Sequence, residues 1–559
     1  MSDQVDEVSE TTGQAGQDGG ADGVREVDAI VIGTGFAGIY SIHKLRNVDG
    51  LSVQAFENAS DVGGTWYWNQ YPGARSDTEV NAYCYSFDKD LFHEWKWSER
   101  YPRQQEIWSY LKHVADRYDL RRSVQFDTQV ETATWDDDAS RWVVTTDRGE
   151  TWRAQFLVEA VGLLSATKVP HFAGMDRFAG EVHHTARWPQ DEPDLSGKRV
   201  GVIGTGSSGV QVISELGDKV GSLTVFQRTP QWVVPSKHRP IAPGLLERIE
   251  NDYEGYWHDV LYSVTAFGFE ESDVAGEEVS YDERIRAFEE QYERGGGFQY
   301  MFQAFNDVAV SRVTNAAATE VIARKIRQTV KDPVTANLLI PSDLYAKRPL
   351  CCDGYYETYN RENVSLVDVQ HNPIVEITER GIRTEDGTEH ELDVIVLATG
   401  FDAVSGNQLK IQHTGRDGVS LHDHWKHRPR THLGLMAHHF PNLYMIYGPM
   451  GPFTNQPPLH EAQVNWVAGT IQHVREHDLG SIEPTADAEE AWIAECDEGA
   501  SGTLFAVTNS WINGSNIPGK PIINMFYMSG SGAYMDKMEE EEKADYAENF
   551  SLGRDRVPA

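Results

Sequence analysis

Cysteine is scarce in this 559-residue chain: there are four, and no two of them form a CxxC pair. This argues against a disulfide framework and a structural zinc site, and we expect no metal. Long apolar runs are also absent, since no stretch approaches the ~20 residues that a membrane helix needs. The first residues lack the basic and apolar regions of a secretory signal. We therefore expect a soluble cytoplasmic protein with no membrane contact.

Positively charged residues are also few. Asp and Glu number 86 against 49 Lys and Arg, which gives a net charge of −37, and only 16 of the basic residues are lysine. Such a surface disfavours binding to nucleic acid or to anionic lipid. It is typical of proteins in molar salt, where the screening length falls to ~3 Å and self-repulsion costs little. We expect the high-salt cytosol of a halophile; an ordinary acidic protein is the alternative.

The remaining composition is that of a multidomain globular protein, with 40% hydrophobic and 11% aromatic residues. Three short apolar runs, 27–33, 199–204 and 392–400, predict buried parallel strands. Three- and four-residue apolar spacing predicts helices over about 240–335. We expect a disordered acidic tail at 1–26 and an acidic, solvated tail at 536–559.

The first apolar run ends in a glycine-rich motif, Gly33-Thr-Gly35-Phe-Ala-Gly38, followed by a helical segment. Such glycines allow a tight turn, close approach of the backbone to a diphosphate, and close helix–strand packing. The next predicted strand ends at Glu57, 24 residues after Gly33, where a carboxylate can accept both ribose hydroxyls. The motif therefore indicates a dinucleotide with a free ribose.

The second run ends in Gly204-Thr-Gly206-Ser-Ser-Gly209, and the residue 24 positions after Gly204 is Arg228. An arginine there suits a ribose 2′-phosphate. We assign FAD to the first motif and NADPH to the second. The predicted fold is α/β, with two Rossmann-like dinucleotide-binding domains. The predicted boundaries are an FAD domain at 27–165 and 391–535, and an NADPH domain at 166–390 that carries the helical subdomain.

The lack of a CxxC pair excludes a disulfide reductase, whereas a hydride-relay flavoprotein stays open. An oxygenase needs a permanent positive charge beside the flavin in a site closed to water, and arginine supplies it.

Two longer motifs carry a family resemblance. Residues 178–189, Phe-Ala-Gly-Glu-Val-His-His-Thr-Ala-Arg-Trp-Pro, match FxGxxxHxxxWP, and residues 63–77 match GGxWxxxxYPGxxxD. Together with the segments around Lys347-Arg348, 398–402, 451–455 and 510–520, they resemble the type I Baeyer–Villiger monooxygenases, most of all the cyclohexanone monooxygenase group. The resemblance runs from about residue 27 to 530.

This resemblance implies an NADPH- and O₂-dependent enzyme that converts a ketone, which we expect to be cyclic, into an ester or lactone through a C4a-peroxyflavin. Arg348 would be the catalytic cation, and Asp77 would position it. We expect no obligate protein partner. A flavin-dependent N- or S-monooxygenase is the alternative.

The resemblance also assigns the remaining site residues. The FAD contacts would be Gly33, Gly35, Phe36, Ala37, Gly38, Glu57, Gly64, Thr65, Trp66, Asp77, Tyr83, Val130 and Met450. The NADP contacts would be Arg75, Ser76, Asp77, Gly204, Thr205, Gly206, Ser207, Ser208, Gly209, Gln211, Arg228, Thr229, Lys347, Arg348 and Trp511. The fingerprint, which we expect to act as a hinge, contains Phe178, Gly180, His184, Trp188 and Pro189.

Overall fold

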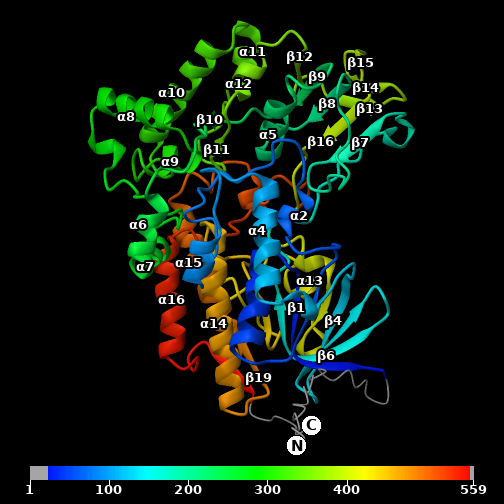
Figure 1. The fold of residues 1–559 in the computed structure, drawn as a ribbon, viewed down its shortest axis with the longest axis vertical. Coiled ribbons are helices and arrows are strands. Elements are labelled where there is room, and N and C mark those ends of the chain that lie inside the picture. Colours follow the sequence, from blue (N-terminus) through cyan, green and yellow to red (C-terminus); the bar gives the residue numbers. More distant parts are fainter. Residues whose placement is uncertain (1–22, 554–559) are drawn as a thin grey trace, which may run out of the picture.

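The computed structural model describes residues 23–553, and two sheets organise them, a mixed one below an all-parallel one in Figure 1. We call the larger sheet and its helices the first unit. It has eight strands in the order β17-β4-β5-β6-β1-β2-β3, with β18 paired to β6. Its strands are β1 Arg25–Ile32, β2 Val53–Phe56, β3 Val124–Gln125, β4 Val130–Asp136, β5 Arg141–Thr146, β6 Thr151–Glu159, β17 Gln412–Thr414 and β18 Leu443–Met445.

The core of the first unit follows from its central strands. β1 is parallel to both β2 and β6, and Ala29 to Ile32 are at most 7% exposed because both faces of the sheet are covered. Helices α1 (Phe36–Ile42) and α4 (Gln104–Arg117) lie beside the sheet together with α14 (Gln456–Glu476). A hairpin of β4 and β5 joins antiparallel to the parallel strands.

The second unit is an all-parallel, five-stranded sheet in the order β12-β9-β8-β16-β7. Its strands are β7 Glu181–His184, β8 Arg199–Ile203, β9 Ser222–Gln227, β12 Val364–Asp368 and β16 Val394–Leu397. Helix α5 (Ser207–Leu216) follows β8, and a meander of β13 (Ile374–Ile377), β14 (Gly381–Thr384) and β15 (Glu389–Glu391) lies next to the sheet.

One predicted boundary is wrong. The apolar run at 392–400 was expected to begin the second part of the FAD domain, but β16 pairs with β7 and β8. The chain therefore stays in the second unit until about residue 400. The run carried no information about which sheet it would join, because both sheets need short strands that are buried on two faces.

Helices fill the segment that was predicted to be helical, and they lie to one side of the second sheet (Figure 1). They are α6 Leu245–Asn251, α7 Tyr253–Tyr262, α8 Tyr281–Arg294, α9 Gly297–Phe302, α10 Arg312–Thr329 and α11 Pro333–Leu338. Helix α8 begins with a capping box in which Ser280 and Glu283 exchange hydrogen bonds, as a Ser-x-x-Glu sequence favours.

The two ends differ from the predicted tails. Most of the N-terminal tail, residues 1–22, lies outside the described residues, and β1 begins at Arg25, inside the predicted tail. At the other end, residues expected to be solvated form α16 (Ser531–Lys543) and β20 (Phe550–Gly553), which pairs with β19 (Ser481–Pro484). Tyr534, Met538 and Glu541 of α16 are buried, so the run of glutamates concealed an amphipathic face.

Glu541 holds α16 to the first unit. Its Oε1 lies 2.8 Å from His432 Nε2, their side chains are 7% and 6% exposed, and Asn549 Nδ2 donates to the same oxygen at 2.7 Å. Replacing Glu541 by alanine should lower the free energy of unfolding by about 1–3 kcal/mol, since His432 and Asn549 would lose their hydrogen-bond acceptor. Urea unfolding measures the change. Glu540→Ala, at an exposed neighbour, should change it by less than about 0.5 kcal/mol; equal losses would contradict the assignment.

Among residues 23–553 no helix is long and apolar enough to cross a membrane, and no cluster of three or more His, Cys, Asp or Glu side chains could hold a metal ion. All four cysteines, which lie in this range, are free thiols.

Candidate functional site

A cavity of about 1320 Å³ is lined by both units, and the turn that follows β1 and the turn that follows β8 both contribute to its wall. Residues 32–37 line it from the first unit, and residues 203–208 line it from the second. The two glycine motifs therefore open into one continuous space, although about 170 residues separate them in the chain.

The glycines of the two motifs have the same backbone geometry. Gly33 and Gly204 have φ of 97° and 108°, and a Cβ on either would lie about 2.5 Å or less from the carbonyl oxygen of Ala160 or Ala398. A Cβ on Gly38 or Gly209 would meet the carbonyl of Gly33 or Gly204. The first and last glycines thus allow the tight turn and the close helix–strand packing.

The middle glycines face free space. A Cβ on Gly206 would find no atom within 4 Å, and one on Gly35 would lie 3.6 Å from the Gly64 Cα. Both glycines line the cavity at the start of a helix, where backbone N–H groups point outward. Both turns therefore fit the diphosphate of a dinucleotide.

Glu57 lines the cavity at the end of β2 and is 4% exposed. Its Oε2 accepts hydrogen bonds from the Thr34 N–H and Oγ1, both at 2.8 Å, and its Oε1 accepts one from the Ala59 N–H at 2.9 Å. Burial raises the pKa of Glu57, and these three bonds oppose the rise. The bonds fix the carboxylate and leave acceptor capacity on Oε1 for a ribose hydroxyl.

The corresponding position of the second unit is positively charged. Arg228 is exposed at the cavity wall, and Lys347 and Lys168 line the same wall. Lys347 Nζ lies 2.6 Å from Asp343 Oδ2, so it is already paired, whereas Lys168 donates to the carbonyl of Asn516. Burial lowers the pKa of Lys168, and the nearby Arg228 lowers it further, so the two cations repel each other. An anion between them would remove this repulsion.

The predicted catalytic pair is formed in the structure. Arg348 Nη2 lies 2.6 Å from Asp77 Oδ1 and Arg348 Nε lies 3.3 Å from Asp77 Oδ2, a two-point contact. The side chains are 30% and 13% exposed, and both residues line the cavity. Burial alone would lower the pKa of Arg348, but the charge and hydrogen bonds of Asp77 outweigh it and raise the pKa. The guanidinium carbon lies 5.1 Å from the centre of the Phe298 ring, which is stacked on Phe267.

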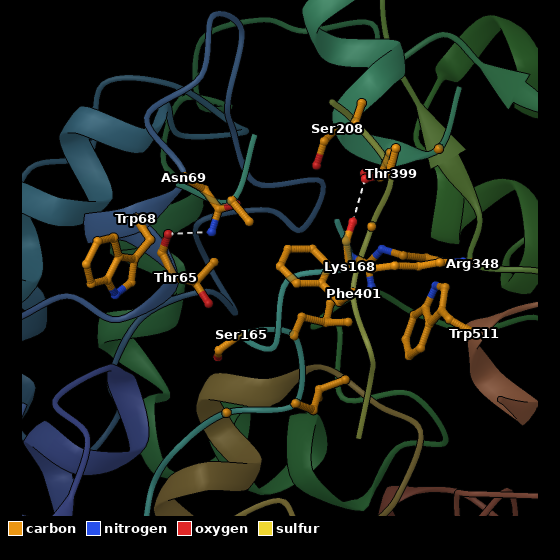
Figure 2. Close-up of a pocket in the computed structure, with 18 of the residues that line it drawn as sticks. Thr65, Trp68, Asn69, Ser165, Lys168, Ser208, Arg348, Thr399, Phe401 and Trp511 are labelled. Atoms are coloured by element: carbon orange, nitrogen blue, oxygen red, sulfur yellow. Dashed lines mark hydrogen bonds between the residues drawn. The ribbon is translucent and has the colours of Figure 1, made fainter. Parts of the chain in front are cut away.

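Trp511 is in a loop that reaches the cavity next to Arg348, as Figure 2 shows. Its ring lies 6.5 Å from Phe453 and 6.0 Å from Phe526. The loop is attached to the two chain segments that cross between the units: Lys168 donates to the Asn516 carbonyl, and Asn516 Nδ2 donates to the Phe401 carbonyl at 2.9 Å.

The fingerprint residue His184 lies at this crossing and does not line the cavity. Its Nδ1 accepts from the Ala186 N–H at 3.0 Å, so in the neutral ring Nε2 carries the proton and can donate to the Lys168 carbonyl at 3.3 Å. The same carbonyl accepts from Thr399 Oγ1 at 2.6 Å, a bond drawn in Figure 2. Burial lowers the pKa of His184, which keeps it neutral. His184 therefore joins the outgoing and returning segments.

Most of the predicted cofactor contacts line the cavity. They include, besides the residues above, Phe36, Ala37, Gly64, Thr65, Trp66, Arg75, Ser76, Tyr83, Val130, Thr205, Ser207, Ser208, Gln211 and Thr229. Hydrogen bonds link several of them. Trp66 Nε1 donates to the Tyr83 hydroxyl at 3.2 Å, and Gln211 Nε2 donates to the Arg75 carbonyl at 3.2 Å.

Other predicted site residues are not part of the wall: Gly38, Gly209, Met450, Phe178, Gly180, Trp188 and Pro189. Met450 is the clearest difference. It is fully buried, with its carbonyl accepting from Trp492 Nε1 at 3.2 Å, so its side chain packs behind the wall. Gly180 has a packing reason, since a Cβ there would lie 2.2 Å from the Asp393 carbonyl.

The structure adds wall residues that the sequence did not indicate, among them Lys168, Arg187, Phe267, Lys410 and His460. His460 is in the first turns of α14, and burial lowers its pKa to about 3. Both Lys168, shortly before the fingerprint, and Arg187, inside it, could have been noticed as cations. The others lie in segments without a recognisable motif.

Glu461, the next residue of α14, gives a pH-dependent prediction. Burial raises its pKa to about 8, although Ser86 donates to both carboxylate oxygens at 2.7 and 2.9 Å. The folded state therefore holds a proton that the unfolded state has lost above about pH 4.5, and stability should fall as the pH rises from there to about 8. Glu461→Gln should melt close to the parent at pH 5 and higher at pH 9. The exposed Glu476→Gln is the control, and a pH-independent difference would contradict the assignment.

Comparison with known proteins agrees with this geometry. Residues 27–243 match the family model described as flavin-binding monooxygenase-like. A Baeyer–Villiger monooxygenase of Pseudooceanicola batsensis is 52% identical over 95% of this chain and 97% of its own. A phenazine N-monooxygenase of Lysobacter antibioticus is 48% identical over 94% and 97%.

Solved structures agree as well. The crystal structure of cyclohexanone monooxygenase from Rhodococcus sp. Phi1 bound to NADP⁺ superposes with a TM-score of 0.93 at 49% identity, over 95% of this chain and 100% of that one. The family and the two-domain fold predicted from the motifs are confirmed. The chain belongs to the Baeyer–Villiger monooxygenase family of flavoprotein enzymes.

Proposed function

We propose that this enzyme binds FAD at the turn after β1 and NADPH at the turn after β8, and inserts one oxygen atom of O₂ next to the carbonyl of a small, cyclic ketone. The observation that carries the proposal is the Arg348–Asp77 pair in the wall of the cavity that both glycine turns share. Amino-acid side chains do not activate O₂, and FAD that has been reduced by NADPH would supply this chemistry.

The wall fits both dinucleotides by charge as well as by shape. Glu57 suits the free ribose of FAD, whereas Arg228 and Lys168 suit the 2′-phosphate of NADPH. Lys347 would join them after exchanging Asp343 for the phosphate.

Arg348 would stabilise negative charge that develops on the substrate oxygen during the reaction. Its guanidinium stays protonated at any working pH, and Asp77 fixes its orientation through two hydrogen bonds. A donor that is held in place before the reaction needs no reorganisation when the charge appears.

Aromatic side chains lie around Arg348 in the cavity. Phe267 lines it and stacks on Phe298 at 3.9 Å between ring centres, and Trp511 lines it next to Arg348. Such a wall excludes water and accepts the hydrocarbon ring of a ketone. It also strengthens the interaction of Arg348 with an oxyanion by lowering the local dielectric.

The crossing segments around His184 would be the hinge. They hold the Trp511 loop through Asn516, so rotation of the second unit would displace Trp511 and the nicotinamide together. Apart from the boundary at residue 391, the domain boundaries, the salt preference and the cytoplasmic location inferred from the sequence stay predictions.

An N-monooxygenase is the second candidate, because a relative that carries that name is 48% identical. Product analysis separates the two. With NADPH, air and cyclohexanone, the enzyme should form a lactone in proportion to the NADPH consumed. NADPH oxidation without lactone from any ketone, together with N-oxide formation from an aromatic amine, would favour the second candidate.

A further inference from the structure

Arg187 reaches from the second unit into the nucleotide site of the first. It follows β7 in the loop that carries the fingerprint, and its N–H donates to the His184 carbonyl at 2.9 Å. Its side chain lines the cavity, with the guanidinium carbon 3.9 Å from the centre of the Trp68 ring. Trp68 ends α2 (Thr65–Trp68), the turn that follows Gly64 in the first unit.

The Arg187 guanidinium has no hydrogen bond or ion pair with any residue of the described part of the chain, 23–553. By contrast, Arg348 and Arg75, which line the same cavity, are each paired with a carboxylate. Two charged groups act on it in opposite directions: Glu57 favours the Arg187 cation, whereas Lys410 disfavours it. Lys410 forms no ion pair with the described residues, although Asp402 acts on it electrostatically. Glu57 is held by Thr34 and Ala59.

A partly buried guanidinium stacked on an indole offers five N–H donors in a fixed plane. It costs free energy unless an acceptor, best an anion, receives them. Because Trp68 fixes the plane and Lys410 adds a second positive charge, the site is prepared for an anion of two or more oxygens.

We propose that Arg187 binds the diphosphate of FAD, so that the second unit closes the first nucleotide site from outside. The inference rests on the assignment of FAD to the turn after β1. The diphosphate of FAD fits better than that of NADPH, because Trp68 and Glu57 both belong to the first unit. Gly64 packs directly on Gly35 of the first turn, which places α2 beside the FAD diphosphate position.

A coupling follows from this geometry. Arg187 is three residues from His184, which fixes the crossing segments, so rotation of the second unit would withdraw the guanidinium from the first site. FAD would be held most tightly when the second unit is docked. Movement of the NADPH-binding unit would thus change the affinity of the first unit for FAD, and Arg187 of the fingerprint would couple the two.

The test is the dissociation constant for FAD, measured by diluting the purified holoenzyme and following the fluorescence of released flavin. Arg187→Gln should raise it by about tenfold or more, because a charge-assisted hydrogen bond is lost. Arg187→Lys should fall between Arg187→Gln and the parent. Arg177→Gln is the control, since Arg177 is exposed in the same unit and pairs with Glu376 at 3.3 Å.

The dissociation constant for NADP⁺ is the second arm, and it should not change. An unchanged FAD constant in Arg187→Gln would overturn the proposal, and so would a change confined to NADP⁺. A higher dissociation constant for FAD in Arg187→Lys than in Arg187→Gln would also overturn it. If the parent enzyme itself held no FAD, the proposed function would fail instead, so the two failures are distinguishable.

Discussion

Replacing Arg348 by alanine should abolish ester formation while FAD stays bound and NADPH is still oxidised slowly. Loss of one fixed donor to a developing oxyanion typically costs ~10²–10³ in rate. Here Asp77, 13% exposed, would also be left as an unpaired carboxylate in the cavity wall, so the loss should reach at least that range. Steady-state product analysis measures it, with NADPH consumption recorded in the same sample.

Two further variants define the role of the pair. Asp77→Asn should lower kcat with a smaller change in KM for the ketone, because it removes the orientation of Arg348 and leaves its charge. Arg324→Ala is the matched control, since Arg324 forms a 2.6 Å ion pair with Glu289 in the helical segment. Ester formation by Arg348→Ala at the parent rate would refute the assigned role.

Replacing Arg228 by alanine should raise the KM for NADPH by about 10- to 100-fold and leave the KM for NADH nearly unchanged. The expected range corresponds to the loss of a charge-assisted contact to the 2′-phosphate, about 1.5–3 kcal/mol. Replacing Lys347 by alanine should raise the KM for NADPH by less, because Lys347 must break its ion pair with Asp343 before it can bind the phosphate. The measurement is the ratio of kcat/KM for NADPH to that for NADH.

Arg361→Ala is the control for Arg228, because Arg361 is in the same unit and pairs with Asp218 at 3.5 Å. An equal fall in kcat/KM for both nicotinamide nucleotides would show that Arg228 does not recognise the 2′-phosphate.

The sequence predicted those features that depend on local spacing. The distance from each glycine motif to Glu57 or Arg228 is set by one strand–helix–strand unit, so the sequence could place both charges in the cavity without a fold. Their contacts with a ribose stay predictions. The Arg348–Asp77 pair was inferred only from the family resemblance, since 271 residues separate the two.

The sequence pattern could not predict features that depend on how distant segments of the chain pack together. The apolar run around β16 predicted a strand but not its sheet, and the glutamates of α16 concealed the side chains that pack against α14. Two residues of the site also depend on packing. Met450 was expected to contact FAD in the cavity wall but lies behind it. Arg187 was not expected there and lines the wall only because the two units meet at this point.

Oxygen insertion next to the carbonyl is tested most directly by following the atoms of labelled O₂ into the product. Purified enzyme with FAD, NADPH and cyclohexanone under ¹⁸O₂ should give a lactone with one labelled atom, at the ring oxygen, and an unlabelled carbonyl. Arg348→Ala should give none under the same conditions. Peroxide as the only labelled product, with cyclohexanone and with larger ketones alike, would contradict oxygen insertion next to a carbonyl.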